Sequence, residues 1–189
     1  MRIILASASP RRKELISKIF DNVEFMPQNV DENIKENNPK ELVKKLSLKK
    51  LNNLDLKYPD YLIISADTIV VFNNKVYGKP KDVEDAVRIL SELNGNTHIV
   101  YTGICIYFNG NKDVFVEESK VTFKQMTPEY IRKYVDEKKP LDKAGAYGVQ
   151  DNEVVKSFEG SYTNIVGLPV ERLENELKKI GAIKWKVFN

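Results

Sequence analysis

Apolar residues follow two different periods along the chain, and segments of the two kinds alternate. Compact apolar runs such as residues 61–65 predict buried strands. Between such runs, apolar residues recur every three or four positions, as at Leu15, Ile16 and Ile19, which is the spacing of one face of a helix. The expected strands are residues 2–6, 61–65 with a continuation over 68–72, 75–77, 97–108, 114–123 and 154–158. Alternating helices and strands predict the α/β class, with antiparallel hairpins added.

Turn and capping residues mark the ends of these elements. Ser9 is a favourable N-cap, and Pro10 suits the first position of a helix. Asn73-Asn74 and Asn109-Gly110-Asn111 are typical of tight turns between antiparallel strands. Further helices are expected to begin at Asn38-Pro39, Asp82, Thr127-Pro128 and Pro169, the last of them ending at Gly181. With no repeat or linker in the sequence, residues 1–189 are expected to form a single domain.

Composition narrows the classes of partner. Charged residues make up 30% of the chain, but the net charge is only +3 and no long basic run occurs, so nucleic acid is not an expected partner. No apolar run approaches the roughly 20 residues needed to cross a membrane. The single cysteine, Cys105, allows no internal disulfide, and residues 1–6 do not form a secretory signal. We therefore expect a cytoplasmic protein.

Two arginines stand where a helix normally carries acids. Arg11 and Arg12 fall in the first turn of their predicted helix, whose dipole is already positive at that end. A strand, a turn of small residues and a helix start bearing two cations is a natural anion site, and phosphate is the commonest anion bound there. The alternative is a pair of solvated arginines. No Gly-x-x-x-x-Gly-Lys-Ser/Thr loop is present.

Asp67 and Lys50 occupy unusual positions. Asp67 follows Ile63-Ile64-Ser65-Ala66 and is expected at the end of a buried strand, where it could bind a divalent cation or accept a proton from water. Its alternative role is to cap a turn. Lys50 lies one turn after Leu46 on an apolar stripe expected to continue to Leu54. It could reach a phosphate, or it could extend along the apolar surface to solvent.

Other polar residues are weaker candidates taken singly. Asp31-Glu32 could help to hold a metal or could be solvated, and Gly78-Lys79-Pro80 is a rigid turn that presents a lysine. His98 is expected to be structural, because a lone histidine cannot form a multi-histidine metal site. The small residues of 144–149 precede Gln150, whose amide could recognise a base edge, and residues 160–169 form a second polar loop. Taken together, these basic and acidic residues suit the binding of a polyphosphate with a metal ion, since cations offset phosphate charge and acids can hold the metal.

The ordered set of motifs resembles the Maf family, also called septum-formation-inhibitor-like proteins, which are nucleoside triphosphate pyrophosphatases. The matching segments span nearly the whole chain in the family's order. They are Ser7-Ala8-Ser9-Pro10-Arg11-Arg12, Val30-Asp31-Glu32, Lys50, Ser65-Ala66-Asp67-Thr68-Ile69-Val70, Gly78-Lys79-Pro80, Asp142 through Gln150, and Gly160-Ser161-Tyr162 through Gly167-Leu168-Pro169. The resemblance implies an elongated mixed β-sheet with flanking helices and a deep cleft between two lobes.

It also implies cleavage between the α- and β-phosphates, with Mg²⁺ or Mn²⁺ as cofactor, and a homodimer. Asp67 matches the catalytic carboxylate, and Asp67 with Glu32 matches the metal-binding acids. The residues that match the substrate-binding group are Ser7, Arg11, Arg12, Glu32, Lys50, Lys79 and Gln150.

The family has branches that differ in substrate. Arg11, Thr68 and Gln150 match the branch acting on dTTP and UTP, whereas the branch acting on 7-methyl-GTP has other residues at these positions. Asp151-Asn152 departs from the family, which usually has glycine after the glutamine. The alternatives are a pyrophosphatase for 7-methyl-GTP or another modified nucleotide, and a non-catalytic nucleotide-binding regulator of cell division. House-cleaning of nucleotide pools and division control would use the same site.

Overall fold

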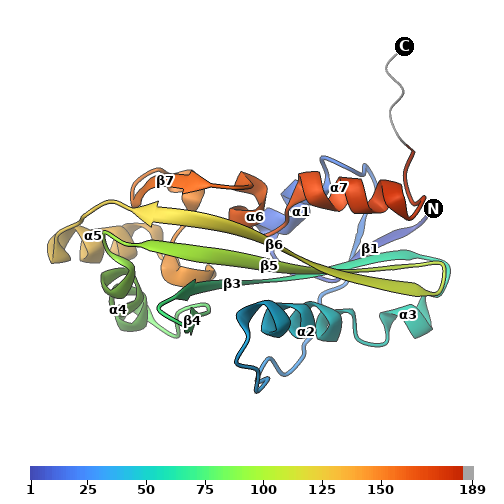
Figure 1. The fold of residues 1–189 in the computed structure, drawn as a ribbon, viewed down its shortest axis with the longest axis horizontal. Helices are drawn as coiled ribbons and strands as arrows, with labels where there is room; N and C mark the ends of the chain where they lie inside the picture. The colour runs from blue at the N-terminus through green and yellow to red at the C-terminus, as the bar shows by residue number, and fades with distance from the viewer. Residues whose placement is uncertain (185–189) are drawn as a thin grey trace, which may run out of the picture.

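A single mixed sheet organises the computed structural model, which describes residues 1–184. The last five residues of the expected domain, 185–189, lie outside the described part. The sheet has seven strands in the order β2-β1-β3-β5-β6-β7, with β4 paired to β3 (Figure 1). The strands are β1 (Ile3–Leu5), β2 (Glu24–Phe25), β3 (Leu62–Phe72), β4 (Lys75–Tyr77), β5 (Thr97–Phe108), β6 (Asn111–Phe123) and β7 (Val155–Glu159). The predicted α/β class with an elongated mixed sheet is confirmed.

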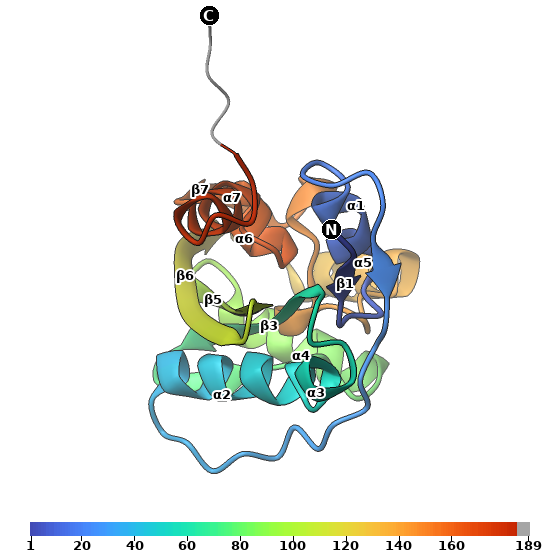
Figure 2. The same cartoon turned by 90° about the vertical axis from the view of Figure 1, so that its right-hand side faces the viewer.

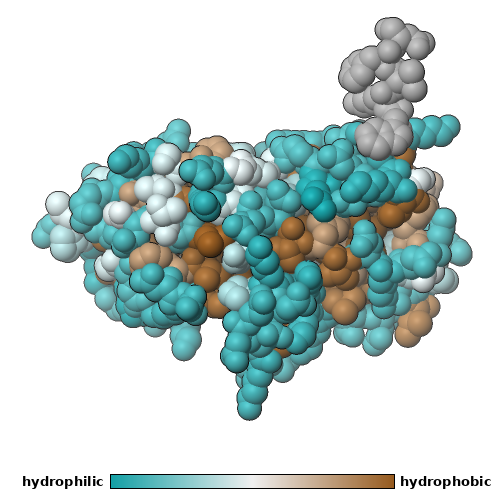
Figure 3. Space-filling model, viewed as in Figure 1, coloured by the Kyte–Doolittle hydropathy of each residue, from teal (hydrophilic) through white to brown (hydrophobic). Residues whose placement is uncertain are grey.

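Helices cover both faces of this sheet. They are α1 (Pro10–Ile16), α2 (Pro39–Leu51), α3 (Leu54–Lys57), α4 (Val83–Leu93), α5 (Pro128–Lys138), α6 (Tyr162–Val166) and α7 (Val170–Lys179), with two 3₁₀ turns, η1 (Ala144–Ala146) and η2 (Val149–Asp151). In Figure 2, α2 and α3 lie on one side of the sheet, and α1, α6 and α7 lie on the other. On the face shown in Figure 3, hydrophobic residues gather between α2 and α7, over the strands.

The pleat of β3 divides its side chains between the two layers. Ile64 and Ala66 pack into a core with residues of α1 and α7, including Leu15 and Leu173. Ile63 belongs to the opposite core, which α2 and α3 cover. Because side chains alternate along a strand, odd-numbered residues of β3 face α2 and even-numbered ones face α1 and α6. Among residues 1–184, no helix has both the length and the hydrophobicity to cross a membrane.

The capping and turn predictions are confirmed by hydrogen bonds. The hydroxyls of Ser9 and Thr127 accept bonds from the first turns of α1 and α5, and the Asp82 carboxylate accepts the amide of Asp85 at 2.8 Å. The two-residue turns at Asn73-Asn74 and Asn109-Gly110 place all four residues at positive φ. That conformation matches the twist of the flanking strands.

Residues 160–169 were expected to form a loop but contain helix α6, strand β2 was not predicted, and several boundaries differ from the sequence prediction. The segments expected at 61–65 and 68–72 form one continuous strand, Leu62–Phe72, so Asp67 lies inside β3 and not at its end. Helix α1 stops at Ile16, and Ile19 packs against the core from the following turn. Leu54 lies in α3, because Asn52 and Asn53 adopt positive φ and end α2. Hydrophobic periodicity did not reveal this break. Leu54 is buried in α3, and a continued α2 would also place it on the apolar face.

One edge of β3 has a gap between its two partners. On this edge β1 pairs with Leu62 to Ile64, in parallel, and β4 pairs with Val70 to Phe72, in antiparallel orientation. On the other edge β5 pairs along almost the whole of β3. Residues 65–69 therefore have a strand neighbour on one side only. Asp67 lies in the middle of this segment, just beyond the carboxyl end of β1.

Candidate active site

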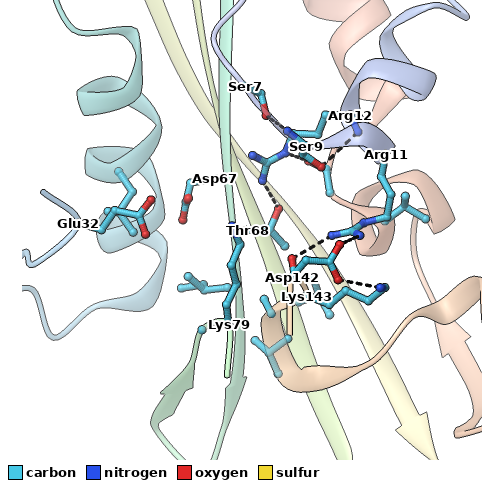
Figure 4. Close-up of a pocket in the computed structure, with 18 of the residues that line it drawn as sticks. Ser7, Ser9, Arg11, Arg12, Glu32, Asp67, Thr68, Lys79, Asp142 and Lys143 are labelled. Atoms are coloured by element: carbon cyan, nitrogen blue, oxygen red, sulfur yellow. Dashed lines mark hydrogen bonds and ion pairs between the residues drawn. The ribbon is translucent and has the colours of Figure 1, made fainter. Parts of the chain in front are cut away.

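A cavity of about 720 Å³ opens at the gap in the edge of β3. The turn from β1 to α1, the central part of β3, the end of β4 and the loop around η1 and η2 all contribute to its lining. The residues that the family resemblance marks for the site all line this one cavity: Ser7, Arg11, Arg12, Glu32, Lys50, Asp67, Lys79 and Gln150. Figure 4 shows how the side chains of several of them are arranged around β3.

Two carboxylates meet at the Lys50 ammonium. Asp67 points from β3 toward α2, and its Oδ1 accepts a hydrogen bond from Lys50 Nζ. The same ammonium lies 2.8 Å from Glu32 Oε1. Lys50 is thus neither solvated nor extended along the apolar surface, because its head group is held between two acids. The 0%-exposed Ser47, one turn earlier, faces β3 as well and accepts a bond on its carbonyl from the Ser65 hydroxyl at 2.7 Å.

The Glu32 carboxylate is kept ionised by its surroundings. Partial burial alone would raise the pKa of Glu32, but the hydrogen bond from Lys50 and the charges of Lys50, Lys79 and Arg12 hold that pKa below its usual value. Glu32 therefore carries its negative charge at neutral pH, as a group that contacts a cation should.

Arg11 is held at another wall of the cavity by an acid. Its Nη1 lies 2.6 Å from Asp142 Oδ2, and its Nη2 donates to the Asp142 carbonyl at 3.2 Å. Lys143 contacts the same carboxylate at 2.8 Å. Burial would raise the pKa of Asp142, but the bonds from Lys143 and Arg11 lower it to about 2. Two cations thus share one carboxylate in a place that an anionic ligand could enter.

Arg12 has a different environment. Nε donates to the Gly167 carbonyl at 2.8 Å, Nη1 to the Ala66 carbonyl at 2.8 Å and Nη2 to the Thr68 hydroxyl at 3.0 Å. Burial lowers the pKa of Arg12, partly opposed by the Asp67 carboxylate. The interpretation of Arg11 and Arg12 as two solvated arginines is wrong, because each is engaged with the protein.

The remaining candidates lie around these two groups. The Ser7 hydroxyl accepts the amide of Ser9 at 3.2 Å in the turn before α1. Lys79 follows β4 and is exposed, and among residues 1–184 it forms no ion pair. Gln150 lies on η2 with its side chain exposed at the cavity. Both long side chains are therefore available to a ligand.

Two residues weighed from the sequence lie elsewhere. Asp31 is exposed outside the cavity lining, where its carboxylate accepts the amide of Asn33 at 2.9 Å, so it is a turn residue. His98 is buried against Phe123 and Tyr147, and its Nε2 lies 2.9 Å from the Tyr147 hydroxyl. Its expected structural role is confirmed.

Sequence reasoning did not single out two groups that shape the cavity. Asp142 and Lys143, which hold Arg11, stood within a matched motif but were not proposed as site residues. Tyr134 of α5 was missed altogether. Its hydroxyl donates to Asp151 at 2.8 Å and accepts the amide of Gly148 at 3.1 Å, which ties α5 to the turn bearing Gln150. The contacts of Asp142 and Tyr134 join residues far apart along the chain, so the sequence pattern does not predict them. The only indication in the sequence is Asp151, which departs from the family pattern.

Asp67 and Glu32 suit a hard divalent cation. Carboxylate oxygens are the donors that Mg²⁺ and Mn²⁺ prefer, and Mg²⁺ is commonly held by one or two carboxylates plus substrate phosphates. Within residues 1–184, no group of three or more acids, histidines or cysteines is placed to enclose a metal. The donor set therefore fits a cation that takes its other ligands from a bound phosphate and from water.

Fold and site together define an α/β protein whose sheet carries, at an edge gap, a cavity with opposed cations and carboxylates. The chain belongs to the Maf family, since the family described as Maf-like protein matches residues 2–180. A dTTP/UTP pyrophosphatase of Carboxydothermus hydrogenoformans is 45% identical over 96% of this chain and 100% of its own length. Another, of Thermosipho africanus, is 42% identical over 97% of this chain and 95% of its own length.

A solved structure shares the fold at low sequence identity. The Ham1 protein of Staphylococcus aureus aligns with a TM-score of 0.58 and 12% identity, covering 95% of this chain and 100% of that one. This likeness concerns the architecture alone.

Proposed function

We propose that this chain hydrolyses dTTP and UTP to the monophosphate and pyrophosphate. The observation that carries the proposal is the cavity in which Lys50 bridges Asp67 and Glu32 while Arg11 and Lys79 reach the same space. A triphosphate needs cations along its chain and a carboxylate near the reacting phosphorus. Relatives at 42–45% identity that carry the name dTTP/UTP pyrophosphatase support the choice of substrate.

In the proposed reaction, Asp67 takes a proton from the attacking water. The water oxygen forms a bond to the α-phosphorus, its proton passes to the Asp67 carboxylate, and the bond from phosphorus to the bridging oxygen breaks. Lys50 holds Asp67 Oδ1, so the other carboxylate oxygen is the one that accepts the proton. Arg11 and Lys79 offset the charge that develops on the departing pyrophosphate. Gln150 contacts the base through its amide.

Asp67 and Glu32 would hold the divalent cation. When bound, such a cation neutralises phosphate charge and polarises the phosphoryl group. We propose Mg²⁺ or Mn²⁺ because both favour oxygen ligands. Removing divalent cations with a chelator should therefore stop pyrophosphate release, and adding either metal back should restore it. The homodimer that the resemblance implies stays a prediction, to be checked by light scattering.

The decisive experiment measures pyrophosphate release from a panel of nucleotides by wild type and the Asp67→Asn variant. We expect dTTP and UTP to be the best substrates, ahead of CTP and 7-methyl-GTP. Asp67→Asn should lower kcat by about a thousandfold, the usual scale for a lost general base, while dTTP binding is largely kept.

Asp31→Asn is the matched control, because it makes the same change on an exposed acid that lies outside the cavity lining. Its kcat should equal that of wild type. If 7-methyl-GTP were turned over faster than dTTP and UTP, the chain would belong to the branch of the family that acts on 7-methyl-GTP. Tight nucleotide binding without turnover by wild type would favour a regulatory module.

A further inference from the structure

The edge of β3 at Asp67 lacks a strand partner, and Arg12 occupies that place. The Ile64 carbonyl on this edge accepts the amide of Ala6 at 2.8 Å, which is the last ladder bond from the β1 side. The next carbonyl on the same edge belongs to Ala66, since carbonyl directions repeat every second residue. Arg12 Nη1 donates to it at 2.8 Å. An unpaired backbone carbonyl at a sheet edge is thereby satisfied by a side chain.

Arg12 also contacts the other neighbour of Asp67. Its Nη2 donates at 3.0 Å to the hydroxyl of Thr68, whose oxygen lies 2.9 Å from the Thr102 hydroxyl on β5. The guanidinium thus binds β3 immediately before and immediately after Asp67. Figure 4 shows Asp67 and Glu32 on one side of the strand and Arg12 with Thr68 on the other.

Gly167 completes the arrangement from a distant part of the chain. Its carbonyl accepts Arg12 Nε at 2.8 Å, directly after α6. The residue has φ of 123°, a conformation that side chains rarely adopt, and a Cβ built there would lie 3.5 Å from Arg12 Nε and 3.4 Å from Thr68 Oγ1. Glycine at 167 therefore lets the carbonyl reach the guanidinium without backbone strain.

All three nitrogens of Arg12 donate to the protein, whereas Arg11 is paired with a half-exposed carboxylate. The bidentate geometry of a guanidinium suits a rigid, several-point bracket better than the point charge of a lysine does. We propose that Arg12 is a positioning residue, which holds β3 to the loop after α6 and so fixes the Asp67 carboxylate toward the α2 side of the cavity. It is not a primary phosphate ligand. This inference rests on the proposed role of Asp67.

The test compares Arg12→Lys with Arg11→Lys in steady-state hydrolysis of dTTP. Lysine keeps the charge but cannot make three divergent hydrogen bonds. Arg12→Lys should lower kcat by about thirtyfold with KM within about twofold of wild type, because misplacing a catalytic group slows chemistry more than binding. Arg11→Lys should instead raise KM while retaining most of kcat. If Arg12→Lys raised KM and left kcat unchanged, Arg12 would be a phosphate ligand and the inference would fail.

A second pair of variants decides the question even if Arg12→Lys does not fold. Thr68→Val removes the hydroxyl that accepts from Arg12 and keeps the shape, and Thr68→Ser restores the hydroxyl. Thr68→Val should lower kcat by about tenfold, on the scale of a lost hydrogen bond to a charged group, and Thr68→Ser should recover most of it. Equal kcat in the valine variant and wild type would overturn the inference. Pyrophosphate release by wild type is the separate control for the proposed function itself.

Discussion

At the scale of single residues, the site is organised by which charge each group touches. Lys50 pairs with two carboxylates, and Asp142 pairs with Arg11, so the acidic and basic side chains of the cavity are in contact with one another. The Lys50–Asp67 pair is largely buried, whereas the Asp142 carboxylate that holds Arg11 is 54% exposed. The Arg11–Asp142 pair is therefore the one that substrate binding should change.

Removing Lys50 should shift the pH dependence of turnover. The hydrogen bond and charge of Lys50 lower the pKa of Glu32 against the effect of burial. In Lys50→Met, the effect of burial, which raises the pKa of Glu32, is no longer offset by the charge of Lys50. Glu32 therefore stays protonated to a higher pH. The acid limb of kcat/KM should then move to higher pH than in wild type.

Lys49→Met is the matched control, since Lys49 contacts Asp31 outside the cavity. Its pH profile should superimpose on that of wild type. An unshifted acid limb in Lys50→Met would show that Lys50 does not govern the ionisation of the site.

At the scale of elements, the short turn η2 is held in place by the longer helix α5. The turn η2 bears Gln150, and Tyr134 of α5 holds it through Asp151 and the Gly148 amide. A Cβ on Gly148 would lie 2.8 Å from Asp151 Oδ2, so a larger residue there would displace the carboxylate that contacts Tyr134. The departure from the family at Asp151 thus has a structural reason, because its carboxylate anchors the loop.

Tyr134→Phe should loosen this turn. The variant removes one hydroxyl that bridges Asp151 and Gly148, and Gln150 loses its fixed position. We expect KM for dTTP to rise about fivefold with kcat nearly unchanged, on the scale of one lost hydrogen bond. Tyr130→Phe is the control, because Tyr130 lies on the same helix with its side chain exposed. Equal effects of the two substitutions on KM would contradict the anchoring role of Tyr134.

At the scale of the whole molecule, a buried histidine couples stability to pH. His98 of β5 packs in the core against Phe123 of β6 and Tyr147, and burial lowers its pKa to about 3. The folded protein thus keeps His98 neutral, whereas the unfolded chain binds a proton below its ordinary pKa of about 6.5. Because the pKa of His98 is lower in the folded state than in the unfolded chain, the folded state has its full stability above about pH 6.5. This contribution to stability is lost as the pH falls from about 6.5 toward 3.

His98→Gln should remove this dependence while keeping a partner for the Tyr147 hydroxyl. Urea unfolding of wild type should show a free energy of unfolding about 1.4 kcal/mol lower at about pH 5.5 than at about pH 7.5 from this group. Between the same two pH values, the free energy of unfolding of the variant should fall by that much less than the free energy of unfolding of wild type, whatever the absolute stability of the variant. Parallel losses in the two proteins would mean that His98 is protonated in the folded state.

Much of the fold was predictable because its signals are local. Capping residues such as Ser9 and Asp82 satisfy backbone groups within their own helix, and the Asn-Gly turn at 109–110 sets its hairpin by backbone conformation alone. Element ends were less predictable. Residues 65–67 were predicted to end a strand because they include polar side chains, but these side chains belong to the site and not to a turn. The break at Asn52 was not predicted because the apolar pattern continues across it.

The sequence by itself determined the α/β class, the caps and turns, and the residues that the family resemblance marks for the site, because these depend on short-range chemistry and motif order. Tertiary structure alone decided which charges touch. The gap between β1 and β4 on the edge of β3, the Lys50 bridge and the Arg12 bracket join residues up to 155 positions apart. Such contacts follow from how the sheet is assembled, and spacing along the chain does not encode them.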